Sequence, residues 1–145
     1  MTKVFTNSPS PSQTTLSLIS ALTKILPPSS TTIQIAQDHV TPRHLTITHS
    51  TSTIVFRIVD HSILGDAGAV ADEVVTRCDD MLFWMRRIFP GSARMRCCVS
   101  LTRKDDFYFL VFYRYVFRNG KRVDVERVGP KLILRLLRDE RHEDE

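Results

Sequence analysis

The sequence predicts a single α+β domain whose antiparallel sheet of about six strands follows the order α-βββ-α-βββ-α, with helices mainly on one face. Two kinds of periodicity predict this class: apolar residues alternate with polar ones in six stretches and recur at spacings of three and four in three others. The 145 residues contain 42% apolar side chains, which is enough for one core. We find no internal repeat and no second core.

The N-terminal residues 1–14 are expected to form a disordered lead-in, because positions 6–14 lack apolar side chains and include two prolines. The domain itself is expected to span residues 15–138, and residues 139–145 to form an acidic tail. Its first element is a short amphipathic helix that ends at Pro27-Pro28. The residues at helical spacing are Leu16, Ile19, Leu22 and Leu26.

Three strands are expected next, at residues 32–36, 44–49 and 53–59, because β-branched residues alternate with polar ones there. They would form an antiparallel meander with one buried face. A long helix is then expected from Asp66 or Ala67 to Phe89, ended by Pro90-Gly91. Its apolar stripe would be Val70, Val74, Cys78, Met81, Met85 and Ile88.

The C-terminal third predicts a strand at residues 96–102 and a long aromatic strand at 107–118. Asn119-Gly120 is a strong signal for a type I′ hairpin turn, since both residues tolerate positive φ. A return strand is expected at residues 121–128. The pair Gly129-Pro130 then predicts a break, followed by a final helix at 131–138.

The charge distribution raises the odds of an anionic partner. Residues 86–138 carry fourteen Lys and Arg against four Asp and Glu, and fifteen of the twenty basic residues in the chain are Arg. Three cysteines, two of them adjacent, argue against a secreted disulfide framework. We therefore expect an intracellular protein, cytoplasmic or nuclear. The acid-free N-terminus also fits a cleaved organelle transit peptide, but a flexible tail is favoured.

No catalytic motif, cofactor motif or metal-ligand spacing occurs, so we expect no enzyme, no cofactor and no metal site. The loop Gly65-Asp66-Ala67-Gly68 resembles the GxxG element of the KH nucleic-acid-binding family. That resemblance would imply a clamp on a sugar-phosphate backbone. An Asp66 N-cap at a strand-to-helix turn is the favoured interpretation.

The aromatic hairpin at residues 107–128 is the candidate functional element, because both of its faces are largely apolar and the domain's helices can cover only one. Counting back from the turn pairs Tyr115 with Asp124 and Tyr113 with Glu126, which would place these carboxylates on the aromatic face.

Two functions follow from this hairpin. The first is a homodimeric module that binds nucleic acid, with RNA favoured, through Arg114, Arg118, Lys121, Arg122 and Arg127. The second is a protein-interaction adaptor that homodimerises through Phe109, Tyr113, Tyr115 and Phe117, without nucleic acid. The third possibility is that helices cover both faces of the hairpin, so that its aromatic residues simply belong to the core. The Ser/Thr-rich lead-in on a compact domain also suggests a viral accessory protein.

Overall fold

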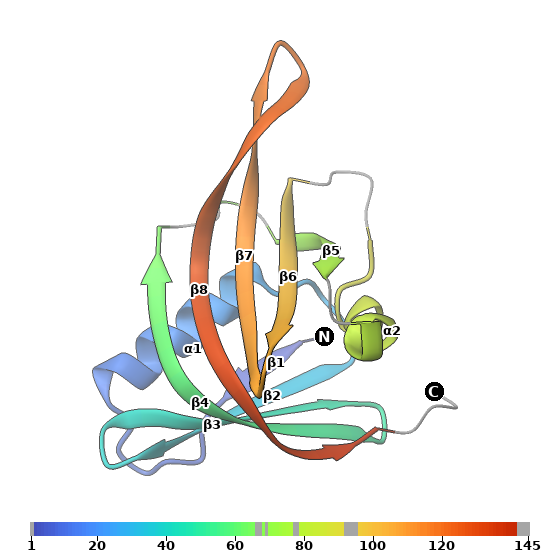
Figure 1. The fold of residues 1–145 in the computed structure, drawn as a ribbon. Coiled ribbons are helices and arrows are strands. Elements are labelled where there is room, and N and C mark those ends of the chain that lie inside the picture. The colour runs from blue at the N-terminus through green and yellow to red at the C-terminus, as the bar shows by residue number, and fades with distance from the viewer. Residues whose placement is uncertain (1, 66–67, 69, 77–78, 92–95, 142–145) are drawn as a thin grey trace.

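The computed structural model describes residues 2–65, 68, 70–76, 79–91 and 96–141. Within these residues, eight strands form one sheet and two helices pack against it (Figure 1). The strand order across the sheet is β1-β2-β3-β4-β8-β7-β6-β5. The elements are β1 (Lys3–Phe5), α1 (Gln13–Ile25), β2 (Thr31–Asp38), β3 (Thr41–His49), β4 (Ser52–Leu64), β5 (Ala71–Thr76), α2 (Asp79–Ile88), β6 (Cys97–Lys104), β7 (Phe107–Arg118) and β8 (Lys121–Glu140).

The sheet is mixed, and the predicted fold class is therefore wrong. The edge strand β1 is parallel to β2 and the opposite edge strand β5 is parallel to β6, whereas the other neighbours are antiparallel. An antiparallel sheet of about six strands was expected. The difference arises because three segments predicted to be helical or disordered form strands or extend one.

The first correction concerns the N-terminus, where residues 3–5 form β1 instead of belonging to a disordered lead-in. Val4 packs against the core, and the Thr2 hydroxyl donates a hydrogen bond to the Pro27 carbonyl oxygen at 2.5 Å. These tertiary contacts offset the entropy of ordering a polar segment. So short a stretch contains no local sequence pattern that predicts these contacts.

The predicted first helix and the meander of β2, β3 and β4 are confirmed. Ser12 is the N-cap of α1, and its side chain accepts a hydrogen bond from the Thr15 backbone N–H at 3.2 Å. The buried face of α1 differs from the expected one, because Leu16 is 45% exposed while Leu18 is fully buried. The face toward the sheet consists of Thr15, Leu18, Leu22 and Ile25.

The second correction concerns the expected helix between Asp66 and Phe89, in which residues 71–76 form the strand β5. Among the residues of this segment that the structure describes, the helix is α2, from Asp79 to Ile88, which lies in the chain between β5 and its parallel neighbour β6. Met81 and Met85 are buried as the apolar stripe predicted. The β-branched residues around Val74 instead pair with β6. A strand there forms hydrogen bonds with the backbone N–H and C=O groups at the edge of β6, which a helix would leave unpaired.

The third correction concerns residues 131–138, which continue β8 and do not form a helix. Leucines at spacing four fit a helix, but Leu132 and Leu134 alternate with exposed or half-exposed neighbours as in a strand. At Gly129-Pro130 the pairing of β8 with β7 shifts register without ending the strand. Because β8 lies between β4 and β7, residues 132–135 are paired with both neighbouring strands.

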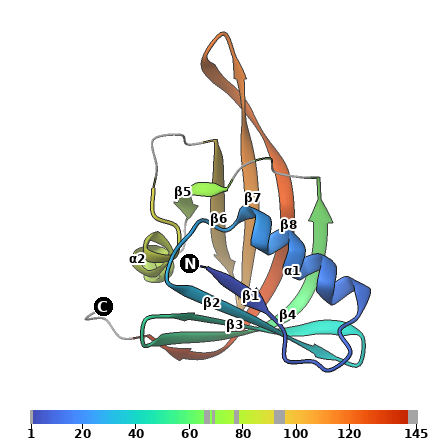
Figure 2. The same ribbon diagram turned by 180° about the vertical axis from the view of Figure 1, so that it is seen from behind.

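One core lies between the helices and a single face of the sheet. Leu18 and Leu22 of α1 and Met81 and Met85 of α2 belong to the same buried cluster as Phe112 of β7. Figure 1 shows α1 behind the sheet, and Figure 2 shows it in front after the half-turn. The other face, called the open face below, has neither described helix over its centre. Among the described residues, no helix is long and apolar enough to span a membrane.

Candidate nucleic-acid interface

The hairpin of β7 and β8 extends well past the rest of the sheet as a two-stranded arm (Figure 1). All residues from 116 to 127 are exposed. Asn119 and Gly120 have φ values of 54° and 77°, and Arg118 pairs with Lys121 across them. The predicted two-residue turn is therefore confirmed.

The register of the arm differs by one residue from the expected one, because a bulge leaves Val123 without an opposite partner. Asp124 lies opposite Val116, and Glu126 lies opposite Arg114. Directly opposed residues share a face of the sheet, and neighbours along a strand lie on opposite faces. The two carboxylates are therefore on the face away from Tyr113 and Tyr115.

The four aromatic residues proposed for an interface all lie on the open face. Tyr108 and Phe112 point into the core with at most 3% exposure, so their odd-numbered neighbours point the other way. Phe109, Tyr113 and Tyr115 are half-buried, and Phe117 is 48% exposed. The third possibility, that helices bury both faces, does not hold for this strand in the described structure.

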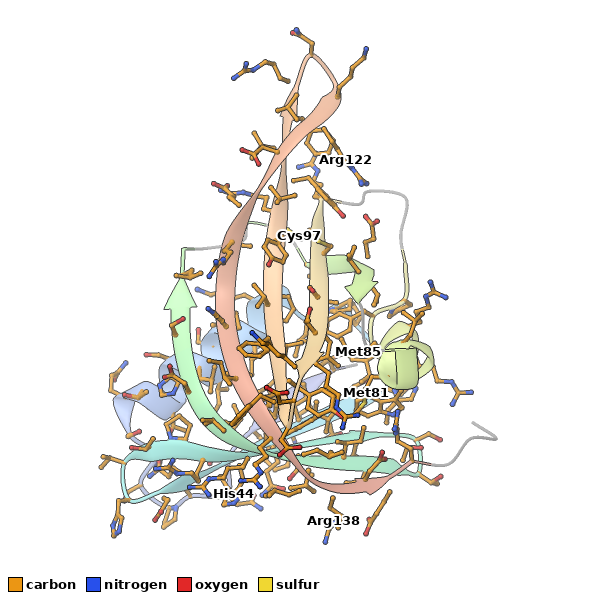
Figure 3. All side chains as sticks on the ribbon, viewed as in Figure 1. His44, Met81, Met85, Cys97, Arg122 and Arg138 are labelled. Atoms are coloured by element: carbon orange, nitrogen blue, oxygen red, sulfur yellow. The ribbon has the colours of Figure 1, made fainter. Side chains whose placement is uncertain are left out.

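Two of the five cations predicted to bind nucleic acid are paired with glutamates. Arg114 forms an ion pair with Glu126, on the face opposite the tyrosines. Arg122, labelled in Figure 3, lies 3.3 Å from Glu73 and stacks 3.9 Å from the ring centre of Tyr115. These pairs reduce the positive charge that the two arginines offer to a ligand.

Tyr115 contacts both members of the second ion pair, Glu73 and Arg122. Its hydroxyl donates a hydrogen bond of 2.9 Å to Glu73. Partial burial, together with hydrogen bonds to Cys98 and Glu73, raises the pKa of the Tyr115 hydroxyl above its ordinary value. Tyr115 therefore stays neutral and fixed, with one ring face occupied by Arg122.

The other three predicted cations, Arg118, Lys121 and Arg127, form no ion pair with any acidic side chain in the described part of the chain. Arg118 and Lys121 flank the turn, and Arg127 lies opposite Tyr113 on the open face. All three are exposed. Arg127 thus presents positive charge beside Tyr113 on the open face, whereas Arg118 and Lys121 present it at the tip of the arm, on the opposite face.

A second group of residues, which the sequence analysis missed, crosses the open face at the base of β7 and includes three Arg or Lys side chains. His44 pairs with Arg57, Arg57 with Arg135, Arg135 with Phe107, and Phe107 with Lys104. We call these five residues the transverse row. Each is exposed, and because each is directly opposite the next, all share one face. They come from five strands, so only the register brings them together.

The GxxG-like loop does not lead into a helix, because the next described element is the strand β5. Asp66 and Ala67 lie outside the described residues, and the strand β5 stands where the helix that Asp66 was predicted to cap was expected. Gly68 has a φ of 69°. Among the described residues, no group of three or more His, Cys, Asp or Glu side chains is arranged to hold a metal ion.

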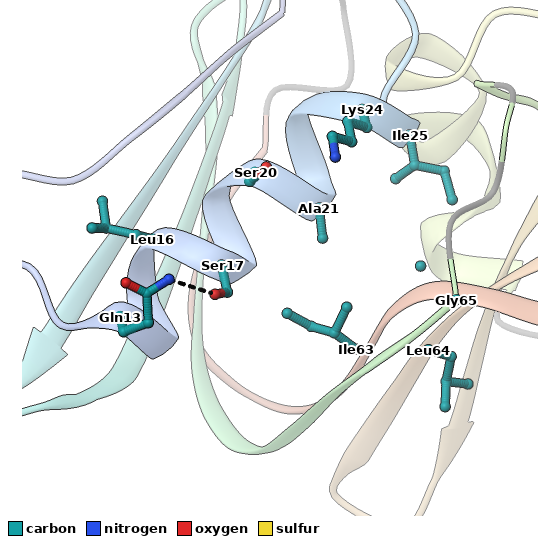
Figure 4. Close-up of a pocket in the computed structure, with 11 residues that line it drawn as sticks. Gln13, Leu16, Ser17, Ser20, Ala21, Lys24, Ile25, Ile63, Leu64 and Gly65 are labelled. Atoms are coloured by element: carbon teal, nitrogen blue, oxygen red, sulfur yellow. Dashed lines mark hydrogen bonds between the residues drawn. The ribbon is translucent and has the colours of Figure 1, made fainter.

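A cavity of about 500 Å³ lies on the helix side of the sheet, between α1 and the end of β4 (Figure 4). Its wall is mixed: Leu16 and Ile63 contribute apolar surface, and Lys24 contributes one charge. The Gln13 side-chain amide donates a hydrogen bond of 3.4 Å to the Ser17 hydroxyl one turn along α1, on one side of the cavity. Because its polar groups do not converge on a point, the cavity does not define a catalytic or cofactor site.

The fold is similar to that of archaeal proteins, one of them a probable ribosomal biogenesis protein. That protein, from Aeropyrum pernix K1, superposes with a TM-score of 0.63 at 13% identity, over 92% of this chain and 94% of its own. Mil, an archaeal Imp4-like protein, superposes with a TM-score of 0.60 at 16% identity, over 93% of this chain and 97% of its own. These identities show a shared fold. No protein-family model and no curated protein sequence matches the chain.

Proposed function

We propose that the protein is a non-enzymatic RNA-binding protein that holds single-stranded RNA against the open face and arm of its sheet. The observation that carries the proposal is the separation of charge on the arm. Tyr113, Phe117 and Arg127 share the open face, whereas Asp124 and Glu126 lie on the other. Because of the bulge, no carboxylate of β8 lies among these aromatic residues.

This combination suits unpaired RNA in particular. Single-stranded segments expose base faces that stack on aromatic side chains, while Lys and Arg contact the phosphates. Phe117 supplies an exposed ring, and Arg118 and Lys121 at the turn supply exposed charge. A two-stranded arm of this kind brings both groups clear of the domain, where a long polymer can reach them.

The shared fold supports a role in assembling a ribonucleoprotein, since one similar protein is described as a probable ribosomal biogenesis protein. Neither similarity supports the viral accessory role, and neither addresses the expected homodimer.

The test measures binding of the purified protein to a labelled single-stranded RNA of about 20 nucleotides across a salt series. We expect affinity to fall steeply as salt rises. The arm variant Arg118→Gln, Lys121→Gln, Arg127→Gln should bind more weakly with a shallower slope, since each lost phosphate contact lowers the slope by about 0.7 for single strands.

The matched control removes three cations from positions away from the arm: Lys3→Gln, Lys24→Gln, Arg86→Gln. Lys24 is on α1 and Arg86 on α2, and both variants lose the same net charge. If the control and the arm variant lower the slope equally, the effect is one of bulk charge. Weak, salt-independent binding by the wild-type protein would remove the proposed function.

A further inference from the structure

We propose that the transverse row is a second phosphate-binding site, which takes the sugar-phosphate backbone of the same single-stranded RNA where it crosses the base of the sheet. This inference rests on the proposed function and adds a site for it on other strands. The row comprises His44, Arg57, Arg135, Phe107 and Lys104.

The charged side chains of the transverse row do not stabilise the sheet. Arg57 and Arg135 are directly opposed on neighbouring strands, and like charges in that position destabilise a sheet. Within the described residues, none of the four basic side chains in the row forms an ion pair with a carboxylate. Such a concentration of exposed positive charge is complementary to a polyanion.

The ligand is identified as RNA by what lies beside the charges. Phe107, 38% exposed, stands between Arg135 and Lys104, and Phe109 follows it on the same face of β7. An exposed ring within a row of cations offers a stacking surface next to phosphate contacts. An acidic protein surface would pair with the charges but has no bases to stack on the Phe107 ring.

The row and the arm are joined by one strand, so a single RNA molecule can contact both. Neighbouring strands lie about 4.8 Å apart, so the four steps from His44 to Lys104 span roughly 19 Å. From Phe107 to Phe117 along β7 is about 34 Å at 3.4 Å per residue. The open-face aromatic residues of β7 lie between these two points.

The test compares the row variant Arg57→Gln, Lys104→Gln, Arg135→Gln with the control Lys3→Gln, Lys24→Gln, Arg86→Gln on the same RNA. We expect the salt slope of the row variant to fall by about two, at roughly 0.7 per contact, and that of the control to stay near wild type. Combining the row and arm changes should lower the slope by the sum of their separate effects.

The outcomes separate the two proposals. If the arm variant loses binding and the row variant behaves like the control, the row is not a binding site and the proposed function stands. If the wild-type protein binds no RNA, the proposed function fails and the row with it. A row variant that loses binding to an acidic polypeptide, while its RNA binding is unchanged, assigns the row to a protein partner and overturns the inference.

Folding of the variants provides an independent readout. Because Arg57 and Arg135 repel each other, the single change Arg57→Gln should leave the melting temperature unchanged or raise it while weakening RNA binding. A lowered melting temperature with unchanged RNA affinity would instead show a structural role for Arg57. Crosslinking of 4-thiouridine-labelled RNA to the wild-type protein should also modify Phe107 or its neighbours on β6 and β8, and the absence of any crosslink there contradicts the inference.

Discussion

At the scale of single residues, the availability of a cation depends on its nearest carboxylate and not on its type. Arg122 and Arg118 lie close together in the arm, yet Arg122 is held by Glu73 while Arg118 has no ion pair among the described residues. Exposed pairs contribute little to stability, about 0 to 1 kcal/mol, so their main effect is on what the arginine can bind. Glu73 thus reduces the charge of the open face.

The first residue-scale prediction follows from that pairing. Glu73→Gln should increase RNA affinity and steepen its salt dependence, because it releases Arg122 on the open face. Glu126→Gln changes the net charge equally but releases Arg114 on the opposite face, so it should have a smaller effect. Binding isotherms of both variants over one salt series provide the measurement. Equal effects would show that RNA responds to overall charge and not to the open face.

At the scale of elements, β8 determines the architecture because it pairs with β4 on one side and β7 on the other. The pairing of this twenty-residue strand with β7 has two irregularities, and its pairing with β4 has two more. Gly129 lies at one of them, with φ at 64°, and its backbone N–H donates a hydrogen bond of 2.8 Å to the Gly65 carbonyl oxygen. This position links the end of β4 to the middle of β8.

We predict that Gly129→Ala lowers the free energy of unfolding by about 2 kcal/mol or more. A Cβ there would meet the Ile25 Cδ1 at 2.9 Å, and left-handed backbone costs a residue with a Cβ about 1 to 2 kcal/mol. Gly65→Ala is the matched control, because its Cβ meets nothing within 4 Å, and it should cost less than about 0.5 kcal/mol. Denaturant unfolding of both variants provides the measurement. Similar losses in the free energy of unfolding would contradict a special steric requirement at Gly129.

At the scale of the whole molecule, RNA binding and the alternative homodimer would use the same surface. The aromatic residues first proposed for a dimer interface lie on the open face, from near the transverse row up into the arm. A second copy seated there would cover Tyr113 and Phe107 together. The two functions therefore predict opposite responses to added RNA.

We expect the free protein to sediment as a monomer and to form a one-to-one complex with a single-stranded RNA of about 20 nucleotides. If the homodimer is correct, the free protein should instead sediment as a dimer, and Tyr113→Ala should shift it toward monomer because buried tyrosines are frequent interface hot spots. Sedimentation at several protein concentrations, with and without RNA, distinguishes the two. A dimer that persists when RNA binds would contradict shared use of the open face.

The sequence by itself determined the elements whose signals are local. The alternating residues of β2, β3 and β4, the long aromatic strand β7 and its Asn119-Gly120 turn all follow from patterns within a few residues. The arm and its candidate residues, including Phe117 and Lys121, could be located in this way. The apolar stripe of Met81 and Met85 also emerged, although the helix that carries it is shorter than expected.

Only the tertiary structure decided what depends on pairing between distant segments. Val74 and Leu132 fit a helical spacing as well as a strand, and the free edges of β6, β4 and β7 select the strand. The bulge at Val123 reverses the expected side of Asp124 and Glu126, because a shift of one residue moves a side chain to the other face. The transverse row has no local signature, since its five residues come from five strands. Backbone pairing across the sheet aligns them, and a linear sequence does not encode that register in any single segment.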